Sequence, residues 1–309
     1  MTPAGPARRR RGLRAATRGS RLARWQTEHV ASLLDVPVEV VVVETAGDRR
    51  SDVPIWEIGG RGVFVKEVQA AVLDGRADIA VHSAKDLPSM PAPGLLLAAV
   101  PERGDPRDAL VGATLDGLPV GATVATGSVR RRAQLASLRP DLTFESLRGN
   151  IDTRLAKAAG FGAVVIAAAA LERLGRTDAI AEVLSPSVMV PQVAQGALAV
   201  ECRDDDEETR AVLAGVEHRP SRRAVDAERA FLARLGGGCD LPVGAYATVD
   251  EGAGVVRLVG LLASLDGHVV LRAERTGDDP VAAGAGLADH LLADAGGSFL
   301  LAESLGVTR

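Results

Sequence analysis

Apolar runs and amphipathic stretches alternate over roughly the first two-thirds of the chain. The runs have the length and composition of buried strands, whereas the stretches between them place apolar residues at helical spacing. We predict strands at 38–44, 77–81, 123–125, 144–147 and 163–167. We predict helices after Ser20, over 63–73 with a stop at Gly75, and after 128, 150 and 167. This alternation favours α/β lobes built on largely parallel sheets.

The pattern changes after about residue 220. Ser221 is predicted to cap a helix that ends near Leu235, and strand-like runs follow at 245–249, 255–263 and 268–273. Asp266 and Gly267, just before the last run, are typical of a tight hairpin turn. A helix over 281–295 completes what we interpret as a small α+β domain, with a three-stranded sheet plus helices.

The predicted fold class is therefore α/β, with two lobes followed by a C-terminal α+β domain. A length of 309 residues favours more than one domain. We expect 1–13 to form a disordered N-terminal extension and 14–101 plus 195–217 to form the first α/β domain. Residues 102–194 are expected to form the second α/β domain and 218–309 the α+β domain.

Composition narrows the class of protein. A hydrophobic content of 47% supplies globular cores, and two cysteines argue against a disulfide framework. No apolar stretch follows the arginines at 8–11, so neither a signal peptide nor an anchor is predicted. A net charge of −4 with 3% aromatic residues gives no footprint for nucleic acid. We expect a cytoplasmic monomer with no nucleic-acid, membrane or metal partner.

Hydroxyl, glycine and arginine residues recur where predicted strands run into helices. The junctions are Thr126-Gly127-Ser128 before Arg130 and Arg131, Arg148-Gly149-Asn150 before Arg154, and the short helix that holds Arg173. Free backbone N–H groups and guanidinium forks at such junctions bind anions. An arginine in a first helical turn is mildly unfavourable for the helix dipole, so its recurrence indicates a negatively charged partner. We expect a ligand with several carboxylates or phosphates between two hinged, periplasmic-binding-protein-like lobes.

Two further residues stand out by their setting. Cys239 follows three glycines, and backbone without side chains lets a bulky group approach a thiol. A loop cysteine after a helix stop is the plainer interpretation. Cys202 ends an apolar run and is expected to be a small, partly buried hydrophobe. Lys85, one of only three lysines among 36 basic residues, follows the strand over 77–81, at the sheet edge where open α/β proteins bind ligands.

Together with their neighbours, these residues form motifs that resemble the porphobilinogen deaminase (hydroxymethylbilane synthase) family over nearly the whole chain. The matching segments, in chain order, are 16–20, 62–67, 77–88, 103–109, 130–131, 146–150, 195–197 and the Gly-Gly-Cys loop at 237–239. Chance agreement of all these segments in order is negligible.

The resemblance implies a transferase of tetrapyrrole biosynthesis. Members of the family carry a dipyrromethane cofactor on the cysteine of the glycine loop, here Cys239, through a thioether. They add four porphobilinogen molecules in turn to that primer with loss of ammonia. Hydrolysis then releases the linear tetrapyrrole hydroxymethylbilane, which would pass to uroporphyrinogen-III synthase.

The resemblance also implies roles for individual residues. Asp86 matches the catalytic carboxylate that hydrogen-bonds pyrrole N–H groups and stabilises positive charge as it develops; capping of the turn before Pro88 is the plainer alternative. His82 is expected to be structural. The cofactor-binding positions are matched by Ser83, Lys85, Asp86, Thr126, Ser128, Arg130, Arg131 and Arg173. The substrate-binding positions are matched by Arg18, Ser20, Arg148, Arg154 and Gln195.

Some positions depart from the family pattern. Gly127 stands where a serine is common, Asp240 where glutamine is frequent, and Trp56-Glu57 where a basic residue is usual. The last pair lies in a loop over 48–62 that we interpret as a cover for the cleft.

Two other classes of function remain open from the residues themselves. One is a non-catalytic solute-binding protein, which would not need Cys239 or a third domain. The other is an enzyme in which Lys85 forms a Schiff base, as with pyridoxal phosphate.

Overall fold

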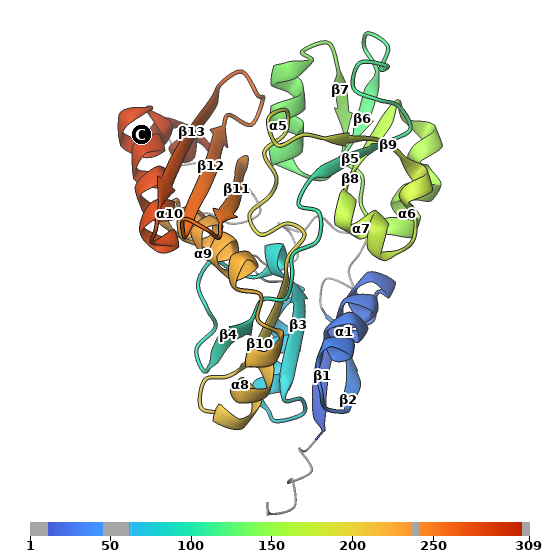
Figure 1. The fold of residues 1–309 in the computed structure, drawn as a ribbon. Helices are drawn as coiled ribbons and strands as arrows, with labels where there is room; N and C mark the ends of the chain where they lie inside the picture. The colour runs from blue at the N-terminus through green and yellow to red at the C-terminus, as the bar shows by residue number, and fades with distance from the viewer. Residues whose placement is uncertain (1–11, 46–61, 63, 237–240, 305–309) are drawn as a thin grey trace, which may run out of the picture.

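The chain folds into three parts, each organised by its own sheet (Figure 1). The computed structural model describes residues 12–45, 62, 64–236 and 241–304. We call the part with the first five-stranded sheet lobe 1, the part with the second five-stranded sheet lobe 2, and the part with the three-stranded sheet the C-terminal part. Among the described residues, no helix is long and apolar enough to cross a membrane.

Lobe 1 has the strand order β2-β1-β3-β10-β4. Strand β1 is parallel to β2 and β3, whereas β10 is antiparallel to β3 and β4. The strands are β1 (Leu13–Arg18), β2 (Val38–Val43), β3 (Ile79–Ser83), β4 (Leu95–Ala99) and β10 (Leu198–Arg203). The helices are α1 (Arg21–Leu33), α4 (Lys66–Leu73) and α8 (Glu207–Leu213), with single 3-10 turns η1 (Ala84–Asp86) and η4 (Ala214–Val216).

Lobe 2 repeats this plan with the order β7-β6-β8-β5-β9. Its fourth strand, β5, is antiparallel to both neighbours, as β10 is in lobe 1. The strands are β5 (Asp108–Val111), β6 (Thr123–Ala125), β7 (Thr143–Glu145), β8 (Ala163–Ala167) and β9 (Ile180–Leu184). The helices are α5 (Val129–Leu138), α6 (Ile151–Lys157) and α7 (Ala168–Arg173), with 3-10 turns η2 (Ala158–Gly160) and η3 (Thr177–Ala179).

The chain passes between the lobes twice, because β10 returns to lobe 1 after lobe 2 is complete. We call residues 100–107 and 185–197 together the crossover. Its two segments touch where Gly104 N donates to Gly196 O at 3.1 Å. Gly196 has a φ of +85°, and a Cβ there would lie 2.5 Å from Gly104 O. Only glycine therefore allows this close approach.

The C-terminal part packs helices against an antiparallel sheet. Strands β11 (Val243–Asp250), β12 (Val255–Ala263) and β13 (Val270–Gly277) form a meander. Helix α9 (Arg219–Arg234) places Phe231 in the core against Gly260, where a Cβ would lie 2.7 Å from the ring. The chain ends in α10 (Pro280–Asp289), a π-turn η5 (His290–Asp294) and α11 (Gly297–Ser304). The same core includes Val193 and Ala194 of the crossover, so this part is packed onto the lobes.

The predicted fold class of two α/β lobes followed by an α+β domain is confirmed. The Ser20 cap is also confirmed, because its side chain accepts from Ala23 N, and Gly267 has the positive φ that the hairpin turn requires. The residue boundaries of the three domains stay a prediction. Residues 1–11 of the predicted extension, and all but Gly62 of the predicted cover over 48–62, lie outside the described residues.

Three local predictions differ from the structure, in a cap, in burial and in bounds. The Ser221 cap is wrong because α9 begins at Arg219, after a His218 side chain that accepts from Ser221 N. The strand predicted at 38–44 is not buried, because β2 lies at the sheet edge and Val42 is 50% exposed. The strand predicted at 144–147 is the shorter β7 at Thr143–Glu145.

Candidate active site

Asp86 lies in turn η1, directly after β3. A pocket beside it is lined by Arg18 at the end of β1, by Ser20 at the cap of α1, and by Ser83. Because β1 and β3 are parallel neighbours, their carboxyl ends bring these side chains to one edge of the sheet. The predicted catalytic carboxylate and two predicted substrate contacts therefore share one pocket.

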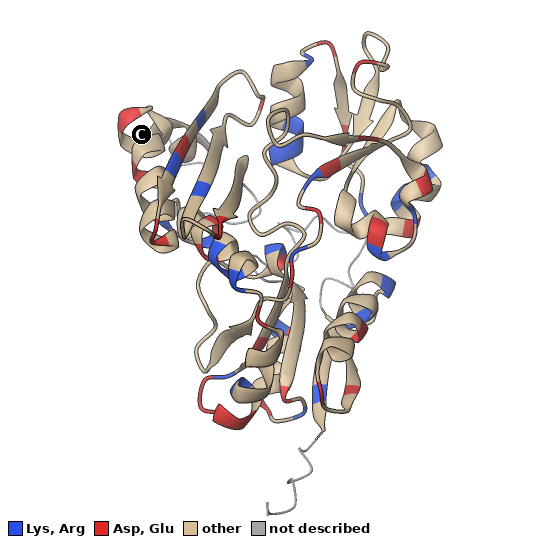
Figure 2. Cartoon of the chain, in the orientation of Figure 1, with Lys and Arg blue, Asp and Glu red and all other residues tan. Residues whose placement is uncertain are grey.

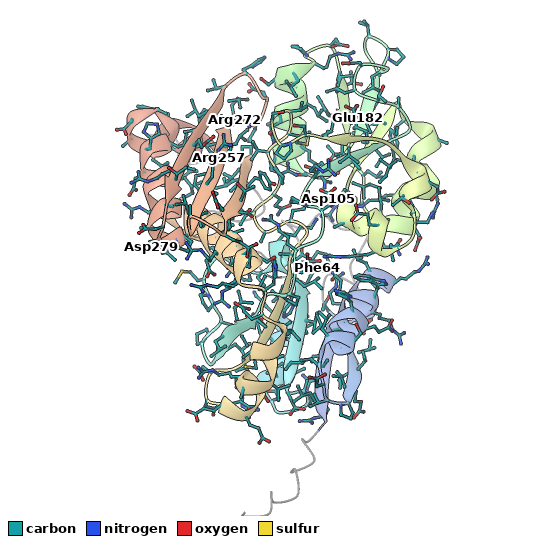
Figure 3. The ribbon with its side chains drawn as sticks, in the orientation of Figure 1. Phe64, Asp105, Glu182, Arg257, Arg272 and Asp279 are labelled. Atoms are coloured by element: carbon teal, nitrogen blue, oxygen red, sulfur yellow. The ribbon has the colours of Figure 1, made fainter. Side chains whose placement is uncertain are left out.

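The polar side chains of this pocket are held in place by the protein. The Arg18 guanidinium carbon lies 4.1 Å from the centre of the Phe64 ring, within the range of a cation–π contact. Phe64 lies near the centre of the molecule, where the lobes meet (Figure 3). Gln26 Nε2 donates to Ser83 Oγ at 2.8 Å. Ser20 Oγ accepts from Ala23 N at 3.3 Å, so its hydroxyl proton is left to be donated.

A second pocket joins all three parts of the chain. Lys85 of lobe 1, Ser128 and Arg130 of lobe 2, and Gln192 of the crossover line it. Leu232, Leu241 and Val243 of the C-terminal part complete its apolar wall. Three of the predicted cofactor side chains, Lys85, Ser128 and Arg130, therefore reach this pocket from separate elements.

Two hydroxyl side chains lie at the start of α5, and one of them, Ser128, lines this second pocket. Ser128 is the N-cap, and its Oγ accepts from Arg131 N at 3.4 Å. Thr126 Oγ1 accepts from Ser128 N at 3.2 Å. Thr126 and Ser128 thus lie at the positive end of a ten-residue helix, where an anion is stabilised.

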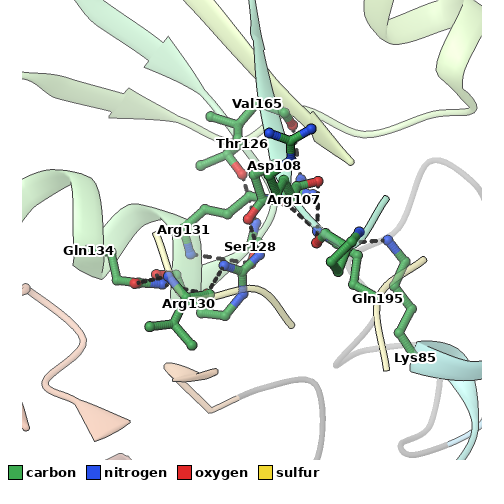
Figure 4. A network of polar contacts seen from close by, with 12 residues as sticks. Lys85, Arg107, Asp108, Thr126, Ser128, Arg130, Arg131, Gln134, Val165 and Gln195 are labelled. Atoms are coloured by element: carbon green, nitrogen blue, oxygen red, sulfur yellow. Dashed lines mark hydrogen bonds and ion pairs between the residues drawn. The ribbon is translucent and has the colours of Figure 1, made fainter. Parts of the chain in front are cut away.

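Arg130 and Arg131 share one buried carboxylate, Asp108 at the start of β5 (Figure 4). Arg130 Nη2 donates to Asp108 Oδ2 at 2.8 Å, and Arg131 Nε donates to Asp108 Oδ1 at 2.9 Å. Asp108 is 0% exposed. Burial by itself would raise the pKa of Asp108, but the two guanidinium groups hold that pKa well below its usual range. The carboxylate is therefore charged at neutral pH.

Lys85 faces this cluster from lobe 1. Its Nζ donates to Gln195 Oε1 at 3.2 Å. Burial of the ammonium, followed by the positive charge of Arg131, lowers the pKa of Lys85 to about 8. The residue as a whole keeps some exposure, but its charged end lies among protein groups. An anionic ligand that replaced the lost solvation would restore an ordinary lysine pKa.

Arg148 and Arg154 extend the positive region along the start of α6. Arg154 Nε donates to Gly149 O at 2.9 Å. Burial, and then the charges of Arg131 and Arg148, lower the pKa of Arg154 to about 10. The charge of Asp86 acts in the opposite direction, so Arg154 and Asp86 are within electrostatic range. Figure 2 shows the basic residues on α5 and around the centre of the molecule.

Arg173 ties lobe 2 to lobe 1. Its Nη2 donates to Gly196 O of the crossover at 2.6 Å, and its guanidinium carbon lies 5.7 Å from the centre of the Trp25 ring on α1. Burial lowers the pKa of Arg173 to about 10. Its side chain therefore lies at the junction of the lobes, where it could also reach a ligand between them.

The two cysteines differ in what the structure shows of them. Cys239 lies outside the described residues. Cys202 in β10 is 0% exposed, more deeply buried than the sequence predicts, and burial raises the pKa of its thiol to about 11. A thiol that is buried and protonated at neutral pH is a poor nucleophile.

Two polar clusters were not predicted from the sequence. Asp108 lies in the 103–109 motif, and two consecutive arginines at the start of a helix require the counter-charge that it supplies. The second cluster contains Glu201 of β10, whose buried carboxylate lies 3.2 Å from His82 Nε2 and accepts from Gln69 Nε2 at 2.8 Å. The contact with Glu201 agrees with the prediction that His82 has a structural role. Strand β10, which carries Glu201, was not predicted from the sequence.

The residues fit a ligand with several carboxylates. Lys85 and Arg130 line the second pocket, and Arg18 lines the pocket beside Asp86. Arg154 lies within electrostatic range of Arg131, Arg148 and Asp86, and Arg131 lies within range of Lys85. The Nε of Arg130 is buried and makes no hydrogen bond within the described chain. A buried donor of this kind calls for an acceptor.

Fold and site together define a class of protein: a two-lobed α/β protein with a third α+β part, whose central pockets have basic side chains suited to a polyanionic ligand. The sequence model described as "porphobilinogen deaminase, dipyromethane cofactor binding domain" matches residues 13–211. The model described as "porphobilinogen deaminase, C-terminal domain" matches residues 223–293. The chain belongs to the porphobilinogen deaminase family.

Similar curated proteins agree with this assignment. A porphobilinogen deaminase of Brevibacillus brevis is 46% identical over 93% of this chain and 96% of its own length. One of Roseiflexus sp. is 49% identical over 93% of this chain and 97% of its own length. Among solved structures, a TRAP periplasmic solute-binding protein of Roseobacter denitrificans with bound glucuronate matches with a TM-score of 0.38 and 11% identity, over 67% of this chain and 78% of the other.

Proposed function

We propose that this protein is a hydroxymethylbilane synthase that condenses four porphobilinogen molecules onto a dipyrromethane primer. Each addition breaks the C–N bond of an aminomethyl group and releases ammonia. A C–C bond then forms to the free α-carbon of the terminal pyrrole, which gives up its proton. Addition of water finally releases the linear tetrapyrrole and leaves the primer on the protein.

The observation that carries this proposal is the pairing of many cations with one pocket carboxylate. Every pyrrole of substrate and product carries an acetate and a propionate, so the chain that grows is a polyanion. Arg18, Arg148 and Arg154 are suited to bind those carboxylates as charged hydrogen-bond donors. They are also fixed cations that would repel the positive charge of the reacting pyrrole, so a nearby anion is required.

We assign to Asp86 the role of the anion that stabilises the positive charge of the reacting pyrrole. Its carboxylate lines the same pocket as Arg18 and lies within electrostatic range of Arg154. Loss of ammonia leaves positive charge spread over the pyrrole ring and its nitrogen. A carboxylate fixed before the reaction stabilises this charge without reorganisation of solvent.

The primer is proposed to be linked to Cys239 and held in the second pocket. When bound, it supplies a nucleophilic α-carbon. Lys85, Ser128, Arg130 and Arg131 would hold its carboxylates, and the start of α5 would add the positive end of a helix. Cys202 is excluded from this role by its burial and raised pKa.

The biological setting follows from the same proposal. We infer that the enzyme works as a monomer in the cytoplasm and that uroporphyrinogen-III synthase consumes its product. These inferences rest on the sequence and on the chemistry of the product.

Intact mass spectrometry of the purified protein tests the primer and its site. We expect the parent and a Cys202→Ala variant to carry the mass of two linked pyrroles, and Cys239→Ala to lack it. The matched cysteine variant separates loss of the attachment site from loss of any thiol. A parent protein that stays unmodified after incubation with porphobilinogen would refute the proposal.

Turnover of porphobilinogen by Asp86→Asn tests the catalytic assignment. We expect the variant to keep its primer mass and to lose about 100-fold in kcat, the usual scale for removal of one preorganised electrostatic group. Asp74→Asn changes an exposed carboxylate of the same lobe and should keep parental turnover. If Asp86→Asn also turned over normally, the charge-stabilising role would belong to another residue.

The lowered pKa of Lys85 also suits a Schiff-base lysine, as in a pyridoxal-phosphate enzyme. Absorbance separates the two functions, because pyridoxal phosphate and oxidised pyrroles have different spectra. A pyridoxal-phosphate spectrum that disappears in Lys85→Arg would favour this alternative.

A further inference from the structure

Gln195 occupies a position that a direct substrate contact does not explain. It is 0% exposed, and both ends of its amide already have partners within the protein. Its Nε2 donates to Asp108 Oδ1 at 2.9 Å and to Pro106 O at 2.8 Å. Its Oε1 accepts from Lys85 Nζ at 3.2 Å. The structure thus favours a different role from the substrate contact that the family resemblance implies.

The polarity of these contacts is specific to an amide. One end must accept from an ammonium group, and the other must donate to a carboxylate. Glutamine does both, whereas ionised glutamate can only accept, and methionine cannot donate and accepts only weakly. Gln195 thereby connects a cation of lobe 1 to the anion of lobe 2, from a residue of the crossover itself (Figure 4).

Asp108, which accepts from Gln195, also accepts hydrogen bonds from the two arginines. Each of its oxygens accepts from one guanidinium group, and each arginine also donates to a backbone carbonyl: Arg130 to Val190 O at 2.6 Å and Arg131 to Val165 O at 2.9 Å. These contacts fix the planes of both guanidinium groups. Within the described part of the chain, the Nε of Arg130 makes no hydrogen bond, and Arg130 lines the second pocket.

We propose that Gln195 and Asp108 are positioning residues that hold Lys85, Arg130 and Arg131 in one fixed arrangement across the two lobes, so that the site can accept an acidic primer. Neither residue needs to touch the ligand. Lys85, Arg130 and Arg131 would repel one another if no anion lay among them. The buried Asp108 carboxylate, which contacts both arginines, offsets part of that repulsion. Gln195 orients the lysine relative to that pair. This inference rests on the proposed function.

The test is the rate at which the protein gains the two-pyrrole mass during incubation with porphobilinogen, starting from apoprotein made in a host without porphobilinogen. We expect Gln195→Met and Asp108→Asn each to slow this gain by about tenfold or more, as for buried residues that orient a charged site. Gln195→Glu keeps an acceptor for Lys85 but loses the donor to Asp108, and it should be slowed as much as Gln195→Met. Thermal unfolding checks that each variant is folded.

Gln69→Met is the matched control. Gln69 is also a buried glutamine, and its Nε2 donates to Glu201 Oε2 at 2.8 Å, but within the described residues it makes no hydrogen bond to Lys85, Asp108 or the two arginines. The variant should lose similar stability and gain the primer mass at the parental rate.

A double variant separates positioning from general damage. If Gln195 acts through Asp108, the two effects will not multiply, and the double variant will be about as slow as the slower single variant. Multiplied effects, or a folded Gln195→Met or Gln195→Glu that gains mass at the parental rate, would overturn the inference. A parent protein that never gains the mass would refute the proposed function, and this inference with it.

Discussion

Replacement of Glu228 by glutamine should destabilise the junction of all three parts. Glu228 in α9 is 0% exposed and accepts four hydrogen bonds. Arg103 of the crossover donates two of them, at 2.7 and 3.1 Å. Ala194 N, also in the crossover, donates the third at 2.6 Å, and Ala247 N of β11 donates the fourth at 2.8 Å. Each carboxylate oxygen accepts two of these bonds.

The magnitude follows from this geometry. Glutamine keeps the shape, but its amide nitrogen cannot accept, so the two bonds to one oxygen are lost and the Arg103 guanidinium loses its counter-charge. Removal of one partner from a buried ion pair costs about 3–5 kcal/mol. At about 2.1 cal/mol/K per residue, a 309-residue chain that unfolds in one transition has an unfolding entropy of roughly 0.65 kcal/mol/K. The expected fall in the midpoint of thermal unfolding is therefore about 5–8 °C.

Thermal unfolding followed by circular dichroism measures this shift, with Glu274→Gln as the control. Glu274 forms the same kind of paired contact with Arg257, but on the exposed surface of β12 and β13. An exposed pair contributes about 0–1 kcal/mol, so the control should lose at most about 2 °C. Equal shifts in the two variants would show that the buried junction contributes no more than a surface pair, and would refute the reasoning.

Two further predictions concern the pocket and the crossover. Because the pKa of Lys85 is about 8, its ammonium loses its proton as the pH rises through that value, so gain of the primer mass should slow above about pH 8. Lys85→Arg should remove this slowing, since a guanidinium group stays charged at this pH. The rate of mass gain, measured against pH in the parent and in Lys85→Arg, tests this prediction. Gly196→Ala should fold poorly, because its Cβ would lie 2.5 Å from Gly104 O. Gly215→Ala is the control, since a Cβ there would meet no atom within 4 Å, and it should keep the parental midpoint of thermal unfolding. Equal midpoints for the two variants would contradict this argument.

The features that the sequence predicted well are local ones. Ser20, Ser128 and Asn150 each accept from a backbone N–H three residues on, so the start of a helix is encoded within a few positions. Asp86 and Lys85 follow a strong apolar run, and the end of a strand in an α/β sheet is where ligands bind. Such signals need no knowledge of distant partners.

The features that the sequence did not predict depend on distant partners. Strands β5 and β10 each pair antiparallel with strands that lie far away in the chain. The contact between Lys85 and Gln195 spans 110 positions. Gln195 was expected to bind substrate because the motif around it resembles the family. Its burial emerges only when the crossover packs against lobe 2, which no local pattern encodes.

The return of β10 to lobe 1 explains why the positioning residues lie where they do. Strand β10 joins the sheet of lobe 1 only after the chain has formed lobe 2. The chain must therefore cross between the lobes a second time, and its two crossover segments run side by side. Gly104 and Gly196 let them touch, and Gln195 directs its amide to Lys85 on one side and Asp108 on the other. The connection that makes two lobes from one chain also carries the contact that aligns their cations. A change in the angle between the lobes would therefore move Lys85 relative to Arg130 and Arg131.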